Sequence, residues 1–308
     1  MKTLYYINRV FIASILLLSF NACKNETSKS EVLATNLETS KEIYQEATDL
    51  SEEFKKYWYS GEAEITSYNL KQVQYGEPRD GSAVLIYVTE DFLPEKQVKA
   101  DRQNPNNIPI LKLNRTKNFI TGIYPYSIMQ STFFPVSNNR HAIKVSSSVQ
   151  EWCGHQYAQL NNRGKFEIKS HAYFERDADN DLSLDKAILE NELWTKLRID
   201  PKSLPIGNLQ IIPSLEYFRL THRPTKAYKA KATLTKGSYT IEYPDLQRTL
   251  VISFNEVFPY DVSGWTETSQ RRGKTLITTA TKKVTIKSPY WGKNSPKDEA
   301  LREVLQLN

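Results

Sequence analysis

Residues 83–88 read Ala-Val-Leu-Ile-Tyr-Val, an apolar run whose length and β-branched content favour a buried strand. The run follows a turn-forming segment, Gly76-Glu-Pro-Arg-Asp-Gly81. Further strand patterns follow at close intervals, each bounded by Asn, Pro or Gly, over residues 108–113, 119–126, 131–136, 141–149, 152–160 and 165–174. Such short connections favour antiparallel pairing, because a parallel crossover needs about a dozen residues or more.

The rest of the chain adds more strands and a few helices. Apolar spacing predicts helices over 43–58, with Gly61 stopping the run, and over 184–197, ended by Asp200-Pro201. Predicted strands cover 209–220, 227–235, 239–243, 250–254, 265–269 and 276–286, and a short helix covers 296–305. We therefore expect a mainly β or α+β fold. It would hold about a dozen strands in antiparallel sheet or sheets with a few short helices, sandwich- or open-barrel-like.

The composition supports a folded body and excludes several classes of site. Of 308 residues, 39% are hydrophobic and 25% charged, which is typical of a folded chain. Aromatic residues make up 11% and favour strands. Two cysteines exclude a disulfide scaffold or a Cys-rich metal site, and 11 glycines leave little room for phosphate-binding loops. We expect neither a cofactor nor a metal.

The N-terminus has the pattern of a lipoprotein signal peptide. Lys2 and Arg9 precede an apolar stretch of eleven residues, Val10–Phe20, which is shorter than the ~20 residues that span a bilayer. The following string ends in Ala22-Cys23 and resembles a bacterial lipobox, in which the cysteine is diacylated and becomes the mature N-terminus. The alternative is an ordinary signal peptide cut after Ala22, which leaves Cys23 unmodified.

Three segments follow from this pattern. Residues 1–22 are the predicted signal peptide, 23–40 a polar flexible tether, and 41–308 a single β-rich body. The helix and linker at 184–206 either divide this body or cap one sheet.

The residue after Cys23 bears on location. Lipoproteins retained at the inner membrane carry Asp there, whereas this chain has Lys24, so we expect the outer membrane, with the body facing the periplasm or the outside. Removing Lys2 and Arg9 from 41 basic residues leaves 39, against 35 acidic residues. No nucleic-acid-binding motif is present. The expected partners are the membrane, through a lipid on Cys23, and an envelope protein, glycan or lipid.

The string Glu151-Trp-Cys-Gly-His155 is the strongest candidate for catalysis. Thioredoxin-like oxidoreductases share Trp-Cys-Gly-His, but their exchange chemistry needs a second nearby cysteine, which this string lacks. On a strand, Glu151, Cys153 and His155 point to one face. Neighbours two residues apart are nevertheless about 6.5–7 Å apart, too far for a nucleophile–base hydrogen bond.

A cysteine hydrolase built on Cys153 would therefore need a base from another strand, such as His141 or His171. The alternative is a structural cysteine packed beside Trp152, with His155 bonded to the backbone. If the strand begins at Trp152, that ring is buried, and Trp152→Ala costs about 3–5 kcal/mol of stability.

Two charged patterns have competing interpretations. Asp177-Ala-Asp-Asn-Asp181 resembles the start of a calcium loop but lacks its glycine and its bidentate glutamate, so the alternative is an acidic turn in which Asp181 or Ser183 caps a helix. Residues 222–293 hold 13 basic and five acidic side chains, a net charge of +8. On one face they would bind anionic lipid headgroups, lipopolysaccharide or acidic glycans, whereas lysines at strand edges would only block aggregation.

Four runs together resemble an uncharacterised lipoprotein family of flavobacterial-type Gram-negative bacteria: Phe54–Leu70, Gly122–Ser127, Ser147–His155 and Tyr243–Leu250. The resemblance spans nearly the whole mature chain. Members often carry the label "septum formation inhibitor Maf", yet Maf proteins are cytoplasmic nucleotide pyrophosphatases with an early Ser-x-Ser-Pro-Arg-Arg motif. The nearest string here, Ser269-Gln-Arg-Arg272, comes late and lacks the proline. The resemblance therefore implies a lipoprotein and no catalytic residue.

Two hypotheses about function remain. The first is a non-enzymatic, outer-membrane-tethered lipoprotein that binds an envelope component or has a structural role there. The second is an envelope cysteine hydrolase that uses Cys153 with a histidine base.

Overall fold

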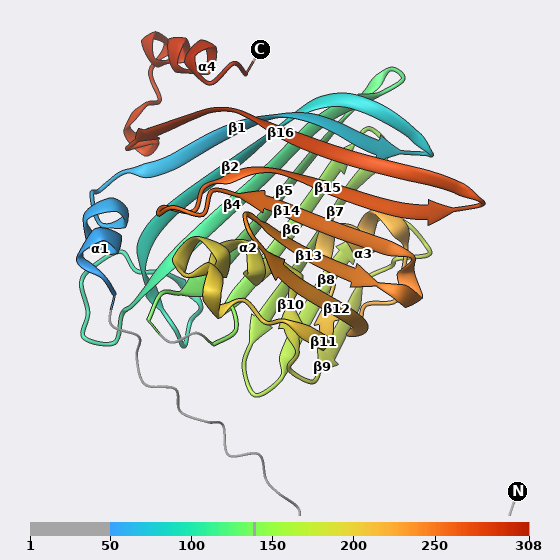
Figure 1. The fold of residues 1–308 in the computed structure, drawn as a ribbon, viewed down its shortest axis with the longest axis horizontal. Helices are drawn as coiled ribbons and strands as arrows, with labels where there is room; N and C mark the ends of the chain where they lie inside the picture. Colours follow the sequence, from blue (N-terminus) through green and yellow to red (C-terminus); the bar gives the residue numbers. More distant parts are fainter. Residues whose placement is uncertain (1–49, 138–139, 308) are drawn as a thin grey trace, which may run out of the picture. The chain divides into compact units, whose positions relative to one another are not determined.

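The computed structural model describes residues 50–137 and 140–307, and all elements below belong to one compact unit, Gln45–Asn308. Strands dominate this unit (Figure 1). The predicted signal peptide, Cys23 and the tether lie outside the described residues, as do residues 43–49 of the first predicted helix.

Sixteen strands within the described ranges form one sheet. The first nine are β1 (Ala63–Gln74), β2 (Glu77–Leu93), β3 (Val98–Lys99), β4 (Ile108–Thr121), β5 (Tyr124–Pro135), β6 (Lys144–Glu151), β7 (Gly154–Asn162), β8 (Phe166–Ala172) and β9 (Asn180–Leu184). The other seven are β10 (Ile188–Leu189), β11 (Gly207–Ile212), β12 (Tyr228–Thr235), β13 (Ser238–Tyr243), β14 (Arg248–Phe254), β15 (Val262–Arg271) and β16 (Lys274–Ser288).

The sheet consists of two meanders joined at β1 and β16. Its order is β10-β11-β12-β13-β14-β15-β16-β1-β2-β4-β5-β6-β7-β8-β9, and β3 pairs with one end of β2. β10 and β11 run parallel, whereas every other pair is antiparallel.

The two edges of this sheet are neighbours in the chain. β9 is the last strand at one edge and β10 the last at the other, yet only residues 185–187 separate them. Three linking residues reach at most about 14 Å, so the edges cannot be far apart. The sheet therefore curls round on itself as an open barrel, and one of its faces is concave.

Antiparallel order gathers one set of turns at one end of the strands. The turns β1–β2, β4–β5, β6–β7, β8–β9, β13–β14 and β15–β16 all lie there, and we call it the mouth end: residues 75–76, 122–123, 152–153, 173–179, 244–247 and 272–273. Figure 1 shows the β1–β2 and β15–β16 turns on the right of the view.

Four α-helices accompany the described strands: α1 (Glu52–Trp58), α2 (Glu190–Ile199), α3 (Leu215–Thr221) and α4 (Ala300–Val304). Short 3-10 turns occur at η1 (Pro201–Ser203), η2 (Pro244–Leu246), η3 (Tyr290–Gly292) and η4 (Pro296–Glu299). In Figure 1, α2 and α3 lie between the strands of the C-terminal half and those of the N-terminal half.

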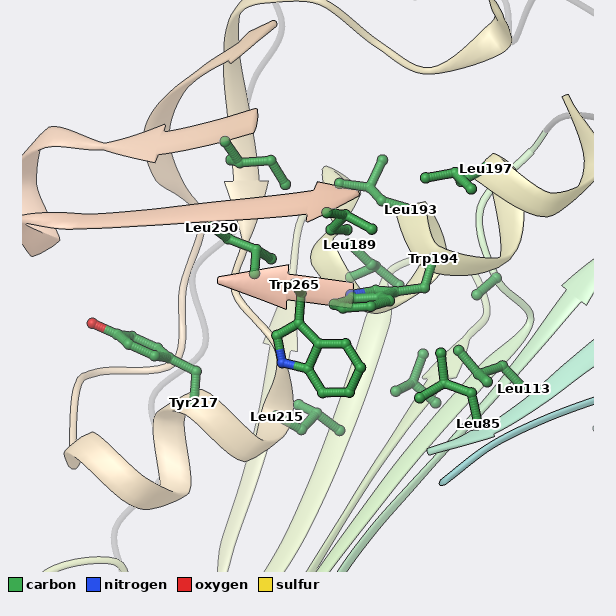
Figure 2. Close-up of a cluster of buried hydrophobic side chains, with 14 of the residues drawn as sticks. Leu85, Leu113, Leu189, Leu193, Trp194, Leu197, Leu215, Tyr217, Leu250 and Trp265 are labelled. Atoms are coloured by element: carbon green, nitrogen blue, oxygen red, sulfur yellow. The ribbon is translucent and has the colours of Figure 1, made fainter. Parts of the chain in front are cut away.

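Helix α2 packs inside the curled sheet, and eight of its ten residues are buried. Trp194 is buried and contacts the ring of Trp265 on β15, with 5.4 Å between ring centroids. Figure 2 shows these rings side by side, with Leu85 and Leu113 on the strands across from them. The core is thus an apolar cluster between α2 and both halves of the sheet. Burying a large aromatic ring in this way contributes several kcal/mol.

The predicted fold class is confirmed: the described chain is mainly β, antiparallel and accompanied by short helices. It forms one continuous sheet rather than the two sheets of a sandwich. The strand count exceeds a dozen partly because β3, β9 and β10 have only two to five residues, too few for a clear pattern.

Several predicted elements are wrong in part. The predicted strand over 119–126 is interrupted at residues 122–123, which form the turn between β4 and β5. The second helix begins at Glu190 rather than 184, because Ile188 and Leu189 pair with β11 instead. The predicted strand over 209–220 ends at Ile212, and helix α3 follows. The Ser214 hydroxyl accepts a hydrogen bond from the Tyr217 amide at 3.2 Å, which caps this helix.

The predictions around Trp152 and the acidic string are also wrong. β6 and β7 pair as far as Glu151 and Gly154, so Trp152 and Cys153 form the turn between them, and Trp152 is exposed rather than buried. The acidic string is followed directly by strand β9 rather than by a helix. Asp181 and Ser183 lie on strand β9 and cap nothing.

Candidate functional site

The concave face of the sheet encloses a cleft of about 670 Å³. Strands β1, β4, β14, β15 and β16, helix α3 and the mouth-end turns line it. Its charged lining falls into two groups. The floor comprises Arg115, Lys117, Glu190, Glu216, Arg248 and Glu267. The mouth comprises Glu151, Arg176, Arg219, His222, Arg223 and Arg271.

One half of the floor is built on Glu216 of α3. Strand alternation places Arg115 and Lys117 of β4 on the same face as its core leucines. Lys117 Nζ donates to Glu216 at 2.6 Å and Arg115 Nη2 at 3.3 Å. Gln130 on β5 donates to the same carboxylate at 2.6 Å. All four side chains are buried, so the carboxylate is held by three donors away from water.

The other half of the floor is built on Arg248 of β14. Its two terminal nitrogens donate to the carboxylate of Glu190, at 2.5 and 2.9 Å, and its Nε donates to Glu267 at 2.8 Å. Tyr243 also donates to Glu190 at 2.7 Å. The Arg248 guanidinium lies 4.4 Å from the centre of the Tyr217 ring.

The charges of the floor balance, because three cations face three carboxylates. Burial by itself would raise the pKa of Glu267, but Arg248, and then Lys117 and Arg115, lower it below its usual value. Glu267 is therefore ionised at neutral pH. A floor of matched charges offers little net attraction to a charged ligand.

The mouth differs, because three of its four arginines lack a matching carboxylate. Arg176, Arg223 and Arg271 are exposed, and no carboxylate in the described part of the chain forms an ion pair with any of them. The acid that lines the mouth is Glu151, which accepts a hydrogen bond from the Cys153 amide at 2.7 Å. The mouth therefore carries an excess of positive charge.

Arg219 and His222 at the mouth share one acidic partner. Arg219 lies 3.6 Å from Asp177 and stacks over the Phe174 ring at 4.8 Å. His222 Nδ1 is 2.9 Å from the same carboxylate. The Arg219 Nε is nevertheless buried with no hydrogen-bond partner among the described residues.

Cys153 lines the mouth but has no catalytic partner. It is an exposed free cysteine, and its hydrogen bond and charge interaction with Glu151 raise the pKa of its thiol. Within the described ranges no hydrogen bond joins it to His155, which is exposed on β7. The carboxylate keeps the thiol protonated, whereas a nucleophile has to be a thiolate.

The two histidines considered as bases have other partners. His141 precedes β6, at the end of the sheet opposite the mouth, and its Nδ1 lies 2.9 Å from Glu192. His171 on β8 lies 3.4 Å from Asp179. The structure thus brings neither of them to Cys153.

The three aspartates of the acidic string, Asp177, Asp179 and Asp181, bind groups of the chain itself. Asp177 pairs with His222, Asp179 accepts the Ala172 amide at 3.1 Å, and Asp181 pairs with Lys169 at 2.8 Å. No group of three metal-ligating side chains occurs in the part of the chain that the structure describes.

The basic excess of residues 222–293 does not form a single patch. Arg248 is buried in the floor, and Lys282 forms an ion pair with an aspartate. Arg223 and Arg271 instead line the mouth. The stretch therefore supplies a paired arginine to the floor and unpaired arginines to the mouth.

Sequence reasoning missed Arg115, Lys117, Glu190 and Glu216. The signal was present in β4, where Leu111 and Leu113 share a face with the two basic residues. Charged side chains on the apolar face of a strand are buried only when they are paired, so they indicate a partner elsewhere in the chain.

Comparisons with known proteins place the chain in no family. No protein-family model matches it, and no curated protein matches it. A search of solved structures finds a β-barrel-like protein of the domain of unknown function DUF1849 from Brucella abortus. It is 6% identical, covers 73% of this chain and 98% of that one, and has a TM-score of 0.37.

None of the helices in the described ranges is long and apolar enough to cross a membrane.

Proposed function

We infer that this chain is a non-enzymatic binding protein, tethered to the outer membrane by a lipid on Cys23, whose cleft binds an anionic ligand. The observation that carries the ligand class is the contrast within the cleft. Floor charges are matched, whereas Arg176, Arg223 and Arg271 at the mouth have no ion-pair partner in the described chain. An anionic group at the mouth would supply the missing charge.

The walls of the cleft fit the rest of such a ligand. The cleft lining also includes aromatic and aliphatic side chains: Phe174, Tyr217, Leu246, Leu250, Trp265 and Leu276. Ligand sites commonly combine such walls with a few polar groups that fix orientation. The proposed ligand is therefore an amphiphile with an apolar or ring-shaped part and a negatively charged head.

A pair of fluorescent probes tests the ligand class. 8-Anilino-1-naphthalenesulfonate carries a sulfonate on the same ring system that N-phenyl-1-naphthylamine presents without charge. Residues 45–308, which contain every described element, should bind the sulfonate more tightly. The double variant Arg223→Gln/Arg271→Gln should weaken sulfonate binding about tenfold, corresponding to ~1.4 kcal/mol, and leave the neutral probe unaffected.

The matched control is Lys229→Gln/Lys231→Gln, which removes two exposed cations of β12 that do not line the cleft. This control should bind the sulfonate like the unchanged protein. Equal losses in the two double variants would contradict a site at the mouth. Equal affinity of the unchanged protein for both probes would contradict an anionic ligand.

The anchor rests on the sequence and needs its own test. In the full chain, Cys23→Ala should prevent acylation and move the protein from the membrane fraction to the soluble fraction. Globomycin should cause the uncleaved form of the unchanged chain to accumulate. Continued membrane fractionation of Cys23→Ala with unchanged mass would contradict the anchor.

A further inference from the structure

The mouth end carries large apolar side chains at the tips of neighbouring turns. Tyr75 is 62% exposed in the β1–β2 turn, Ile123 82% in the β4–β5 turn and Trp152 68% in the β6–β7 turn. Tyr173 follows β8 and is 78% exposed. These turns connect successive strand pairs at the mouth end, so the four side chains belong to one row. We call them the hairpin-tip row.

Side-chain contacts through Tyr124 join two members of the row, Tyr75 and Trp152. The Tyr75 hydroxyl is 2.7 Å from that of Tyr126, and the Tyr124 hydroxyl donates to Tyr75 at 3.4 Å. The Tyr124 ring is 6.3 Å from the ring of Trp152. Several large apolar side chains exposed at neighbouring turns are uncommon on a soluble protein and indicate an interaction surface.

Basic side chains extend the row on one side. The β15–β16 turn lies next to the β1–β2 turn in the sheet order and presents Arg271, Arg272 and Lys274. From residue 268 to residue 297 the chain contains no acidic residue. Arg272 and Lys274 are exposed and do not line the cleft, so their charge is directed outward rather than into the ligand site.

We propose that the hairpin-tip row, together with Arg272 and Lys274, docks on the surface of a bilayer containing anionic phospholipid. Tryptophan and tyrosine favour the membrane–water interface, because their rings are apolar and their edges hydrogen-bond to headgroups. Ile123 enters the acyl boundary, and the two cations bind lipid phosphate. Side chains at separate turn tips insert between lipids independently.

This docking orients the cleft. Arg176, Arg223 and Arg271 lie at the same end as the hairpin-tip row, so a docked molecule opens its cleft towards the lipid surface. The inference goes beyond ligand binding, because the docking side chains Ile123, Arg272 and Lys274 are not part of the cleft lining.

Vesicle sedimentation tests the proposal. Residues 45–308, which carry no acyl chain, should sediment with vesicles of phosphatidylethanolamine and phosphatidylglycerol at 3:1, and at least tenfold less with pure phosphatidylcholine. Ile123→Asp/Trp152→Asp should reduce binding to the anionic vesicles at least tenfold. Both side chains are exposed, so the variant should keep the far-UV circular dichroism and melting temperature of the unchanged protein.

The opposite end of the sheet supplies the matched control. Ile206 and Trp291 are 63% and 55% exposed, and they adjoin strands β11 and β16 at the end away from the mouth. Ile206→Asp/Trp291→Asp should bind vesicles like the unchanged protein. Equal losses in both Asp pairs would overturn the proposal, as would a lack of sedimentation by the unchanged protein.

Two further measurements separate the apolar and charged contributions. Arg272→Gln/Lys274→Gln should weaken binding to the anionic vesicles at least threefold, and less so in 0.5 M salt. The tryptophan emission of the unchanged protein should shift to the blue on vesicle binding, and Trp152→Phe should abolish that shift. A blue shift that persists in Trp152→Phe would overturn the proposal, because Trp152 would then not be the inserted ring.

Discussion

The floor and the mouth of the cleft both contain arginines and carboxylates, but they differ in how far these charges are paired and buried. In the floor, Arg248 has two carboxylate partners and Lys117 has one, and these side chains are buried apart from Glu267, which is 26% exposed. At the mouth, Arg223 and Arg271 face solvent without a carboxylate partner in the described chain. The comparison shows that pairing and burial, rather than residue type, separate charges that hold a fold together from charges available to a ligand.

The largest expected effect comes from breaking the floor. Glu216→Leu would leave Arg115 and Lys117 buried without their carboxylate and should lower the free energy of unfolding by about 3–5 kcal/mol. Urea denaturation of residues 45–308 measures the loss. Arg223→Gln at the mouth is the matched change and should stay within about 0.5 kcal/mol. Similar losses in both variants would remove the distinction between floor and mouth.

Two tryptophans sharpen the same comparison through packing. Trp265 on β15 is buried against Trp194 of α2, so Trp265→Ala should cost about 3–5 kcal/mol. Trp152 is exposed at the mouth end, and Trp152→Ala should cost no more than about 0.5 kcal/mol. Thermal melts of the two variants side by side provide the measurement. A large loss in Trp152→Ala would mean that its ring packs into the body.

Acid should act on the floor through Glu267. Arg248 holds the pKa of this carboxyl below its usual value of about 4.5, so its contribution to stability is fully present above pH 4.5. That contribution is lost as the pH falls through the lowered folded pKa, because protonation removes the charge that Arg248 binds. Glu267→Gln should therefore flatten the acid limb of stability against pH.

The control for this pH dependence is Glu242→Gln, an exposed residue on β13. It should reproduce the acid limb of the unchanged protein. An unaltered limb in Glu267→Gln would show that the Arg248 pair contributes nothing to acid sensitivity.

The smallest expected effect concerns Cys153 at the mouth. Glu151 raises the pKa of the thiol, so the folded protein should alkylate more slowly at pH 7.5 than a free cysteine does, although the thiol is accessible. Glu151→Gln should speed alkylation a few-fold. Mass spectrometry with iodoacetamide follows the rate. Alkylation of the unchanged protein faster than that of free cysteine would revive the hydrolase hypothesis.

Much of the fold could be predicted from local pattern. The strands alternate between core and solvent, as β14 does from Arg248 to Phe254, and short turns dictate antiparallel order. Two local errors have local causes. Tyr217 and Phe218 favour a strand, but Ser214 starts a helix there. The aromatic ring of Trp152 favours a strand as well, although Trp152 and Cys153 form a two-residue turn.

The cleft could not be predicted in the same way. Arg115 and Glu216 are 101 residues apart, and Arg248 and Glu190 are 58 residues apart. No spacing rule connects them, since the curl of the whole sheet brings them together. The exposed position of Ile123 likewise indicates an interaction surface only once the neighbouring hairpins are known to end together at the mouth end.

The central pairing of β1 with β16 has a consequence for the order of folding. Ala63 pairs with Ser288, so the middle ladder of the sheet joins segments more than 200 residues apart. The strands from β1 to β9 pair mostly with their neighbours in sequence and can assemble as they are synthesised, but β1 keeps one unpaired edge until β16 exists. High contact order of this kind slows folding and prolongs exposure of a strand edge to aggregation. A chain truncated before β16 would therefore leave one side of β1 unpaired and open to aggregation. A chain shortened after β16 would keep that side of β1 paired.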